Sequence, residues 1–159
     1  MSNKGDIFDN LLRFSNEVKL IERDGKVYIW DPIRKKYLIK QEEELVRQLV
    51  LQYFIKEQNW PEKLVRVEKQ IDLAGAKKRF DIVLYSSVEQ ALILIECKSP
   101  SHKLDQKVFD QISNYNLTLK IPYLIVTNGI NSYLLKIDFT NNNYEFINSI
   151  PKQNNEQST

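Results

Sequence analysis

Several residue types are scarce in this chain of 159 residues, which has one cysteine, one histidine, four glycines and five prolines. A single cysteine, Cys97, excludes an internal disulfide and the cysteine-rich zinc modules. So few glycines and prolines exclude a collagen-like or low-complexity chain. The scarcities leave an ordinary globular protein of a reducing compartment.

Long hydrophobic runs are also missing. The longest, such as residues 91–95, hold about five residues, far fewer than the roughly 20 that a membrane-spanning helix needs. The N-terminal residues MSNKGD lack the apolar segment of a signal peptide. We therefore expect a cytoplasmic protein with no membrane partner.

Charge of one sign is not in excess. The chain has 23 Lys and Arg residues against 21 Asp and Glu, and this net charge of +2 does not by itself indicate a polyanionic partner. Because 42% of the residues are hydrophobic, the chain can bury a core. We predict one domain over residues 6–150, between a disordered N-terminus at 1–5 and a disordered polar tail at 151–159.

The hydrophobic pattern predicts alternating strands and helices. The predicted elements are a β-hairpin of residues 18–21 and 27–30 that 37–39 extend, a helix at 41–58, strands at 64–71, 79–85 and 91–98, a helix at 104–119, and strands at 123–127, 133–137 and 144–147. This order favours an α/β (α+β) domain with a central mixed sheet flanked by helices and an N-terminal β-hairpin extension. The nearly all-apolar strand at 91–98 is typical of a central strand covered on both faces.

Chemistry concentrates at the end of that central strand. Side chains alternate along a strand, so Glu96 and Lys98 project from one face and Cys97 from the other. Asp81 begins the apolar run of the preceding strand, and a hairpin-like pairing places it beside Glu96 and Lys98. Two carboxylates and a lysine suit a Mg²⁺ site whose remaining positions go to water and substrate phosphate. The plainer alternatives are a surface Glu96–Lys98 pair and a strand-start cap, or a partner for Arg79, at Asp81.

Both predicted helices carry polar candidates. Glu43 lies three residues before Val46, on or near the inward stripe of its helix, although glutamates in a first turn most often complement the helix dipole. Gln111 and Tyr115 share one face of the second helix at a spacing of four residues. A polar site or an exposed stripe would explain this second pair equally.

These residues resemble the D…(D/E)-X-K signature of PD-(D/E)XK nucleases, with a phenylalanine in place of the proline before Asp81. More specifically, the chain resembles the N-terminal nuclease domain of type I restriction enzyme R subunits, and most of all small stand-alone proteins made of that domain. The segments that carry the resemblance are WDPIRKKY at 30–37, EELVRQ at 43–48, KRFDIV at 78–83, IECKSP at 95–100, QISNYN at 111–116 and YLIVTNG at 123–129.

The resemblance implies a restriction-endonuclease-like PD-(D/E)XK core and a role for each matched residue. It makes Asp81 and Glu96 metal-binding carboxylates, Lys98 the lysine that activates water, and Glu43, or alternatively Glu44, the helical acid that completes the metal site. Gln111 and Tyr115 match an element that supports the site and the DNA contact. The implied cofactor is Mg²⁺ or Mn²⁺.

The resemblance further implies a DNA nuclease, a homodimer or a larger restriction or repair complex. The chain has no G-x-x-x-x-G-K-[S/T] loop, so we expect no ATP-driven motor. The basic residues that could form a phosphate-binding rim, or be ordinary solvated lysines and arginine, are Lys77, Lys78, Arg79, Lys103 and Lys107. The alternatives are a poorly catalytic or partner-dependent nucleic-acid-binding module on the same fold, and a nuclease specific for branched or damaged DNA. These residues do not distinguish DNA from RNA.

Overall fold

The computed structural model describes residues 6–153. Its elements in chain order are the 3₁₀ helix η1 (Leu11–Glu17), strands β1 (Leu20–Arg23), β2 (Lys26–Asp31) and β3 (Lys36–Ile39), helix α1 (Glu42–Gln52) with the π-helical turn η2 (Tyr53–Glu57), the 3₁₀ turn η3 (Glu62–Leu64), strands β4 (Val65–Leu73), β5 (Ala76–Ser87) and β6 (Gln90–Cys97), helix α2 (Gln106–Leu119), and strands β7 (Tyr123–Thr127), β8 (Ser132–Asp138) and β9 (Asn143–Ile147). The predicted order of strands and helices agrees with these elements, whereas η1 is an element that the pattern did not predict. Of the residues predicted to be disordered, 1–5 and 151–159, the stretches 1–5 and 154–159 lie outside the described residues.

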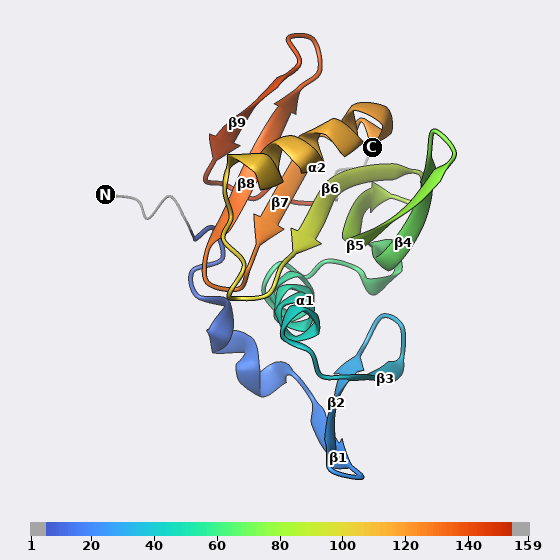
Figure 1. The fold of residues 1–159 in the computed structure, drawn as a ribbon, viewed down its shortest axis with the longest axis vertical. Coiled ribbons are helices and arrows are strands. Elements are labelled where there is room, and N and C mark those ends of the chain that lie inside the picture. Colours follow the sequence, from blue (N-terminus) through green and yellow to red (C-terminus); the bar gives the residue numbers. More distant parts are fainter. Residues whose placement is uncertain (1–5, 154–159) are drawn as a thin grey trace, which may run out of the picture.

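A six-stranded sheet forms the centre of the domain, in the order β4-β5-β6-β7-β8-β9. All neighbours are antiparallel except β6 and β7, which are parallel. A parallel pair needs a crossover connection, and α2 supplies it. Figure 1 shows α2 running across one face of this sheet, with α1 on the other side near the ends of β5 and β6. The predicted mixed sheet flanked by helices is therefore confirmed.

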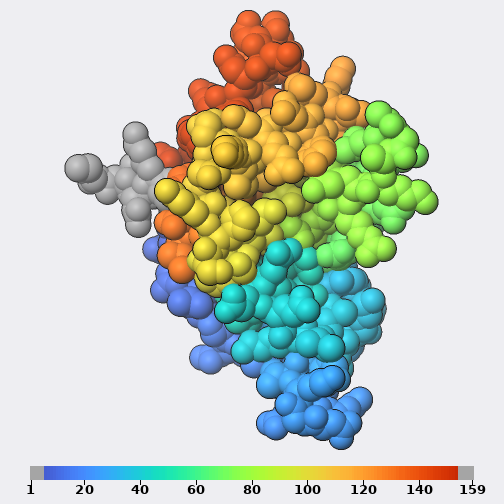
Figure 2. All heavy atoms as spheres, in the orientation of Figure 1, coloured from blue at the N-terminus to red at the C-terminus, as the bar shows by residue number. Residues whose placement is uncertain are grey.

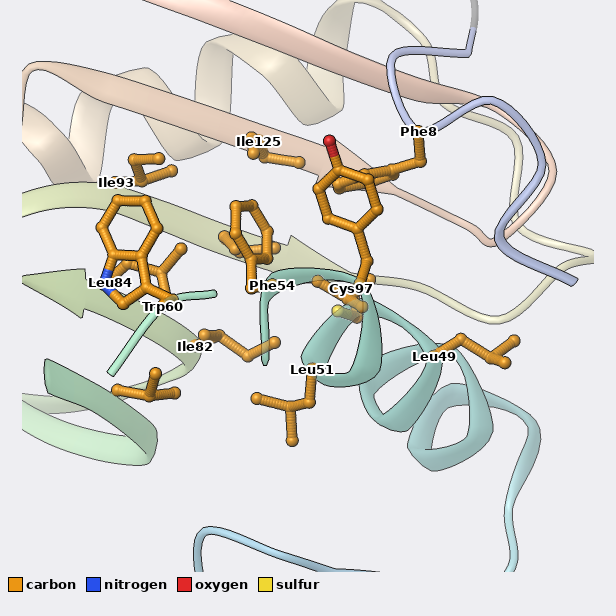
Figure 3. Close-up of a cluster of buried hydrophobic side chains, with 14 of the residues drawn as sticks. Phe8, Leu49, Leu51, Phe54, Trp60, Ile82, Leu84, Ile93, Cys97 and Ile125 are labelled. Atoms are coloured by element: carbon orange, nitrogen blue, oxygen red, sulfur yellow. The ribbon is translucent and has the colours of Figure 1, made fainter. Parts of the chain in front are cut away.

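Two hydrophobic clusters hold the layers together, one on each face of the sheet. The cluster on the α1 side contains Phe54, Trp60 and Cys97 among others (Figure 3). The cluster on the α2 side contains Phe109 and Leu124 among others. Along β6, residues 93 and 95 belong to the first cluster and residue 94 to the second. This alternation shows that β6 is covered on both faces, as the sequence predicted.

Helix α1 begins with three glutamates, which complement the positive end of the helix dipole. Its residue Val46 packs against the turn that follows β7, where Gly129 has a φ of +87°. A Cβ at Gly129 would lie 3.0 Å from Cγ2 of Val46, so glycine permits both the turn and the close packing. Among the described residues, no helix combines the length and the apolar character that crossing a membrane requires.

Strands β1, β2 and β3 form a separate antiparallel sheet. Asp24 and Gly25 both have positive φ at its first turn, which is the conformation that a tight two-residue hairpin needs. Figure 1 shows this small sheet at the lower end of the molecule, next to the beginning of α1. It is the predicted β-hairpin extension with β3 as its third strand.

Candidate active site

Asp81 and Glu96 lie opposite each other on adjacent strands. The register pairs Ile82 of β5 with Ile95 of β6, so the next pair toward the sheet end is Asp81 and Glu96. Both carboxylates are buried, with 7% and 6% of each residue exposed. Asp81 Oδ2 also accepts a hydrogen bond from the backbone N–H of Cys97 at 2.8 Å. The predicted convergence of the two acids is present, and Asp81 is fixed to the backbone of β6.

Glu96 is the more unusual of the two acids. Its Oε1 is buried and has no hydrogen-bond partner among the described residues. Burial, and after it the charge of Asp81, raises the pKa of Glu96 to about 8, while Lys78 and Lys98 act in the opposite direction. A buried carboxylate oxygen without a partner is unfavourable, because it has lost its hydration without a replacement. The site therefore has an unsatisfied acceptor that a cation or a donor would stabilise.

Lys98 lies directly after β6, and its backbone N–H donates to Thr127 O of the neighbouring strand at 2.8 Å. Side-chain alternation places it on the same side of the strand as Glu96. Its side chain is partly exposed, and its charge counteracts the raised pKa of both Glu43 and Glu96. Lys98 thus lies at the solvent side of the two acids.

The two candidate helical acids differ from the prediction in their burial. The Glu43 side chain, predicted to be on or near the inward stripe, is 47% exposed, whereas that of Glu44 is 9% exposed. Glu44 accepts from Arg34 at 2.7 Å and from Arg47 at 2.5 Å, so arginines surround its carboxylate. Burial, followed by the charge of Asp81, raises the pKa of Glu43. Glu43 is therefore the more exposed of the two helical acids, and its Oε1 lies 3.9 Å from Nη2 of Arg47.

Arg47 is a central residue of the site to which the sequence analysis gave no role. Its Nη2 donates to Asp81 Oδ1 at 2.5 Å and lies 2.7 Å from Glu68 Oε1. Burial by itself would lower the pKa of Arg47, but Asp81 and then Glu44 outweigh it, and the pKa is raised. A buried guanidinium is stable only when carboxylates pair with it, as they do here.

A second unpredicted acid, Glu68, comes from β4. Its neighbours Val67 and Lys69 pair with Ile82 and Phe80, while Glu68 itself has a φ of +55°. Such a conformation is strained for a residue with a side chain and is often found at functional sites. The local distortion coincides with the contact between Glu68 and Arg47, which brings a further carboxylate to the site.

The small sheet is attached to α1 through a buried aspartate. Asp31 is fully buried and accepts hydrogen bonds from the backbone N–H groups of residues 33 and 34, from Nε of Arg34 at 2.7 Å, and from Nε2 of Gln48 at 3.0 Å. Arg34 also binds Glu44. Polar residues at positions 44, 47 and 48 share one face of α1, and this spacing was the available signal for a buried polar network.

Gln111 and Tyr115 lie on the α2 side of the sheet. Gln111 is exposed, and its Nε2 donates to the Tyr115 hydroxyl at 3.4 Å. The Tyr115 ring lies 4.6 Å from Nζ of Lys78, within the range of a cation–π contact. Lys78 also counteracts the raised pKa of Glu96, so this lysine connects Tyr115 with Glu96.

The remaining candidates lie around the site or support it. Lys77, Arg79, Lys103 and Lys107 are exposed, as a phosphate-binding rim requires, and as ordinary surface residues would be. Asn128 is buried, and its amide holds the loop after β6 by donating to His102 O at 2.9 Å. Burial, followed by the charge of Asp81, raises the pKa of Cys97 well above its ordinary value, which fits an unreactive apolar position.

Comparison with known proteins shows the family to which this chain belongs. The model of the family described as type I restriction enzyme R protein N terminus (HSDR_N) matches residues 42–151. The chain belongs to this family. The match begins with α1 and includes Asp81, Glu96, Lys98, Gln111 and Tyr115.

A solved structure has the same fold as this HSDR_N chain. It is a fragment assigned as the HsdR subunit of a type I restriction enzyme from Vibrio vulnificus YJ016, with 17% sequence identity and a TM-score of 0.52. The match covers 71% of this chain and 24% of that one, so this chain corresponds to about a quarter of the fragment. Among curated proteins, none matches the chain significantly.

The HSDR_N site has the donor chemistry of a hard-cation site. Carboxylate oxygens are the ligands that Mg²⁺ and Mn²⁺ prefer, and Mg²⁺ is commonly held by only one or two carboxylates together with water and substrate phosphate. The unpartnered Oε1 of Glu96 and its neighbour Asp81 fit this pattern. Within residues 6–153, no three Asp, Glu, His or Cys side chains are grouped closely enough to enclose an ion. The residues therefore fit a two-carboxylate cation site beside Arg47.

Proposed function

We propose that this protein is a divalent-metal-dependent nuclease that hydrolyses phosphodiester bonds in DNA, on a restriction-endonuclease-like PD-(D/E)XK core. The observation that carries the proposal is the pairing of Asp81 with Glu96 at the ends of adjacent strands, with Lys98 two residues further on. Membership of the HSDR_N family supports it. We also propose action as a homodimer or within a larger restriction or repair complex in the cytoplasm, without ATP.

The carboxylates of Asp81 and Glu96 would hold Mg²⁺ or Mn²⁺, with Glu43 as a further helical acid outside this two-carboxylate pair. The bound ion would polarise the phosphate and lower the pKa of a water molecule. Burial explains why both carboxylates would favour a cation, since each is almost fully desolvated. The raised pKa of Glu96 reflects its burial and the neighbouring charge of Asp81, which outweigh Lys78 and Lys98.

Lys98 would act on the attacking water. Its ammonium group, at the open side of the acids, would orient the water and offset charge on the phosphate. Hydrolysis forms a bond from the water oxygen to phosphorus and breaks one backbone P–O bond, while the water loses a proton and the departing oxygen gains one. The basic residues Lys77, Lys78, Arg79, Lys103 and Lys107 would bind flanking phosphates, and Gln111 and Tyr115 would support the DNA contact.

One observation favours a second candidate function, a nucleic-acid-binding module that cleaves only with a partner. Arg47 pairs directly with Asp81 and supplies the positive charge that a metal ion would otherwise bring. A partner or substrate that draws Arg47 away would then activate the site. Under this alternative the isolated protein binds DNA and cleaves it poorly.

The test is cleavage of a nucleic-acid panel by purified protein in Mn²⁺, Mg²⁺ or EDTA. The panel contains supercoiled, linear, single-stranded and branched DNA, and RNA. Asp81→Ala and Lys98→Ala are compared with Lys136→Ala, a control that removes an exposed lysine from β8. The proposal expects cutting that EDTA and both site variants abolish and that the control retains. Binding without cutting by every preparation would favour the second candidate, and cutting that survives both site substitutions would contradict the proposed site.

A further inference from the structure

The small sheet has two faces of different character. Ile29 and Asp31 of β2 are fully buried and lie on the face turned toward α1. Alternation and the strand register place eight other residues on the opposite face, which we call the aromatic face: Lys19, Ile21, Arg23, Lys26, Tyr28, Trp30, Tyr37 and Ile39. It includes the cross-strand neighbours Trp30 and Tyr37, whose ring centroids are 5.0 Å apart.

The aromatic face carries positive charge only. Its three cations come from Lys19, Arg23 and Lys26, and none of them forms an ion pair within residues 6–153. The acids of the same strands, Glu22 and Asp31, alternate to the other face. Residues 19–40 together have seven basic and three acidic side chains, although the whole chain has a net charge of only +2. The positive charge of this protein is thus concentrated on the small sheet, which fits a polyanionic partner.

The aromatic side chains narrow the class of polyanion. Tyr28, Trp30 and Tyr37 are each partly exposed on the sheet surface. Aromatic rings presented by a sheet bind nucleic acid by stacking on bases, with nearby cations along the backbone. Bases in a duplex are stacked on each other and offer no free ring face. The combination therefore fits a single strand better than a duplex.

A groove at the start of α1 is lined by residues of β3 and by residues around the candidate active site. It has a volume of about 400 Å³, and its lining residues are Leu38, Ile39, Gln41, Glu43, Glu44, Arg47 and Glu68. Ile39 belongs to both the groove and the aromatic face, and Arg47 contacts Asp81. Figure 2 shows the blue atoms of the small sheet below the cyan atoms of α1.

We propose that the aromatic face binds a single-stranded segment of DNA and directs it along this groove to Asp81 and Glu96. The preferred substrate would then be DNA with an unpaired segment, such as a tail or flap. The direction of the strand to the site rests on the proposed nuclease function, but strand binding by the face does not. Because several groove residues are acidic, we expect the aromatic face, and not the groove, to hold the single strand in the absence of metal.

The test measures binding of an oligothymidine strand of about 20 nucleotides, and of a duplex of the same length, in EDTA. Fluorescence anisotropy gives the affinity, and quenching of tryptophan emission reports on Trp30, because the other tryptophan, Trp60, is only 2% exposed. The variants are Trp30→Ala with Tyr37→Ala, Trp30→Phe, and Arg23→Gln with Lys26→Gln. The matched control, Lys36→Gln with Lys40→Gln, removes the same charge from the opposite face.

The expected results differ for each variant. The wild type binds the single strand more tightly than the duplex and loses Trp30 emission on binding. The double alanine variant binds the single strand about tenfold or more weakly, and Trp30→Phe restores most of the affinity. The arginine–lysine variant lowers the salt slope of binding by about 1.4, at roughly 0.7 per lost phosphate contact, while the control leaves it unchanged. Because Trp30→Phe keeps an aromatic ring in the sheet, its binding shows whether the loss in the double alanine variant comes from the missing ring or from a folding defect.

Three outcomes would overturn the inference: equal or tighter binding of the duplex, unchanged single-strand binding in the aromatic variant, and equal losses in the two charge variants. If the second outcome is accompanied by a monomer–dimer shift in the aromatic variant, the face is a contact between copies of the chain. If the aromatic face binds the single strand as predicted but no substrate is cleaved, the proposal for the face is supported and the nuclease proposal fails.

Discussion

The guanidinium of Arg47 binds the carboxylate of Asp81, with Nη2 2.5 Å from Oδ1. The same guanidinium contacts Glu44 and Glu68, so one buried arginine neutralises acids from α1, β4 and β5. This arrangement explains how a cluster of carboxylates can remain charged inside the protein without a bound cation. It also makes Arg47 the natural competitor of a metal ion at Asp81.

Replacement of Arg47 should therefore be costly for folding. We expect Arg47→Met to lower the free energy of unfolding by about 3–5 kcal/mol, because it leaves several carboxylates buried without a counterion. Urea denaturation measures the change. Arg13→Met is the control, since its pairing with Glu57 is largely exposed and should contribute less than about 1 kcal/mol.

A divalent ion should compensate for the loss of this arginine. If Mg²⁺ or Mn²⁺ binds beside Asp81, it will raise the melting temperature of Arg47→Met more than that of the wild type. An equal rise in both proteins, or none, would show that no ion takes the place of the guanidinium.

The buried Glu96 predicts a pH dependence of stability. The pKa of Glu96 in the folded protein, about 8, lies above the ordinary value of 4.5. The contribution of Glu96 to the free energy of unfolding is therefore fully present below about pH 4.5 and is lost as the pH rises toward 8. Glu96→Gln should remove this loss and become the more stable protein as the pH rises, with an upper limit of about 5 kcal/mol. Urea denaturation of the metal-free proteins between pH 5 and about pH 9 measures it. A constant difference across that range would contradict the raised pKa.

The two helical acids should differ in metal binding. The Glu43 side chain is half exposed and its pKa is raised by the charge of Asp81, so we expect Glu43→Gln to weaken Mn²⁺ binding by about tenfold in isothermal titration, as the loss of one ligand or its supporting partner typically does. Glu44→Gln should mainly lower the melting temperature, because the carboxylate of Glu44 is bound by two arginines. The reverse pattern would identify Glu44 as the ligand.

The turn at Gly129 should not tolerate a side chain. Gly129→Ala combines a positive φ with a Cβ 3.0 Å from Val46, and we expect it to lower the free energy of unfolding by about 2 kcal/mol. Gly25→Ala is the control, because its φ is also positive but no atom lies within 4 Å of its Cβ. Similar losses in both variants would mean that the contact with Val46 contributes nothing.

Much of the fold could be predicted from the sequence because its signals are local. The apolar run of β6, the turn at Asp24 and Gly25, and the spacing of apolar residues in α1 each determine an element without distant information. The hairpin of β5 and β6 also placed Asp81 beside Glu96, since a short connection fixes which strand ends meet.

The rest of the site depends on contacts that no local pattern describes. Glu68 reaches the site through a single residue of positive φ, which strand alternation does not predict. Arg47 lies on a helix face that periodicity predicts to be buried, but its partners come from β4 and β5. Periodicity also placed Glu43 near the inward stripe. In the structure Glu44 is the buried acid instead, because Arg34 of the small sheet binds its carboxylate.

Single-turnover cleavage with Lys98→Ala is the decisive measurement of whether Asp81, Glu96 and Lys98 form a metal-dependent nuclease site. The substrate is tailed duplex DNA with Mn²⁺, and binding of the same DNA is measured in parallel. We expect the variant to bind DNA and Mn²⁺ nearly as the wild type does but to cleave at least about 100-fold more slowly, the usual range for the loss of a group that assists proton transfer. Cleavage at the wild-type rate by the metal-loaded variant would show that Lys98 does not take part in the reaction.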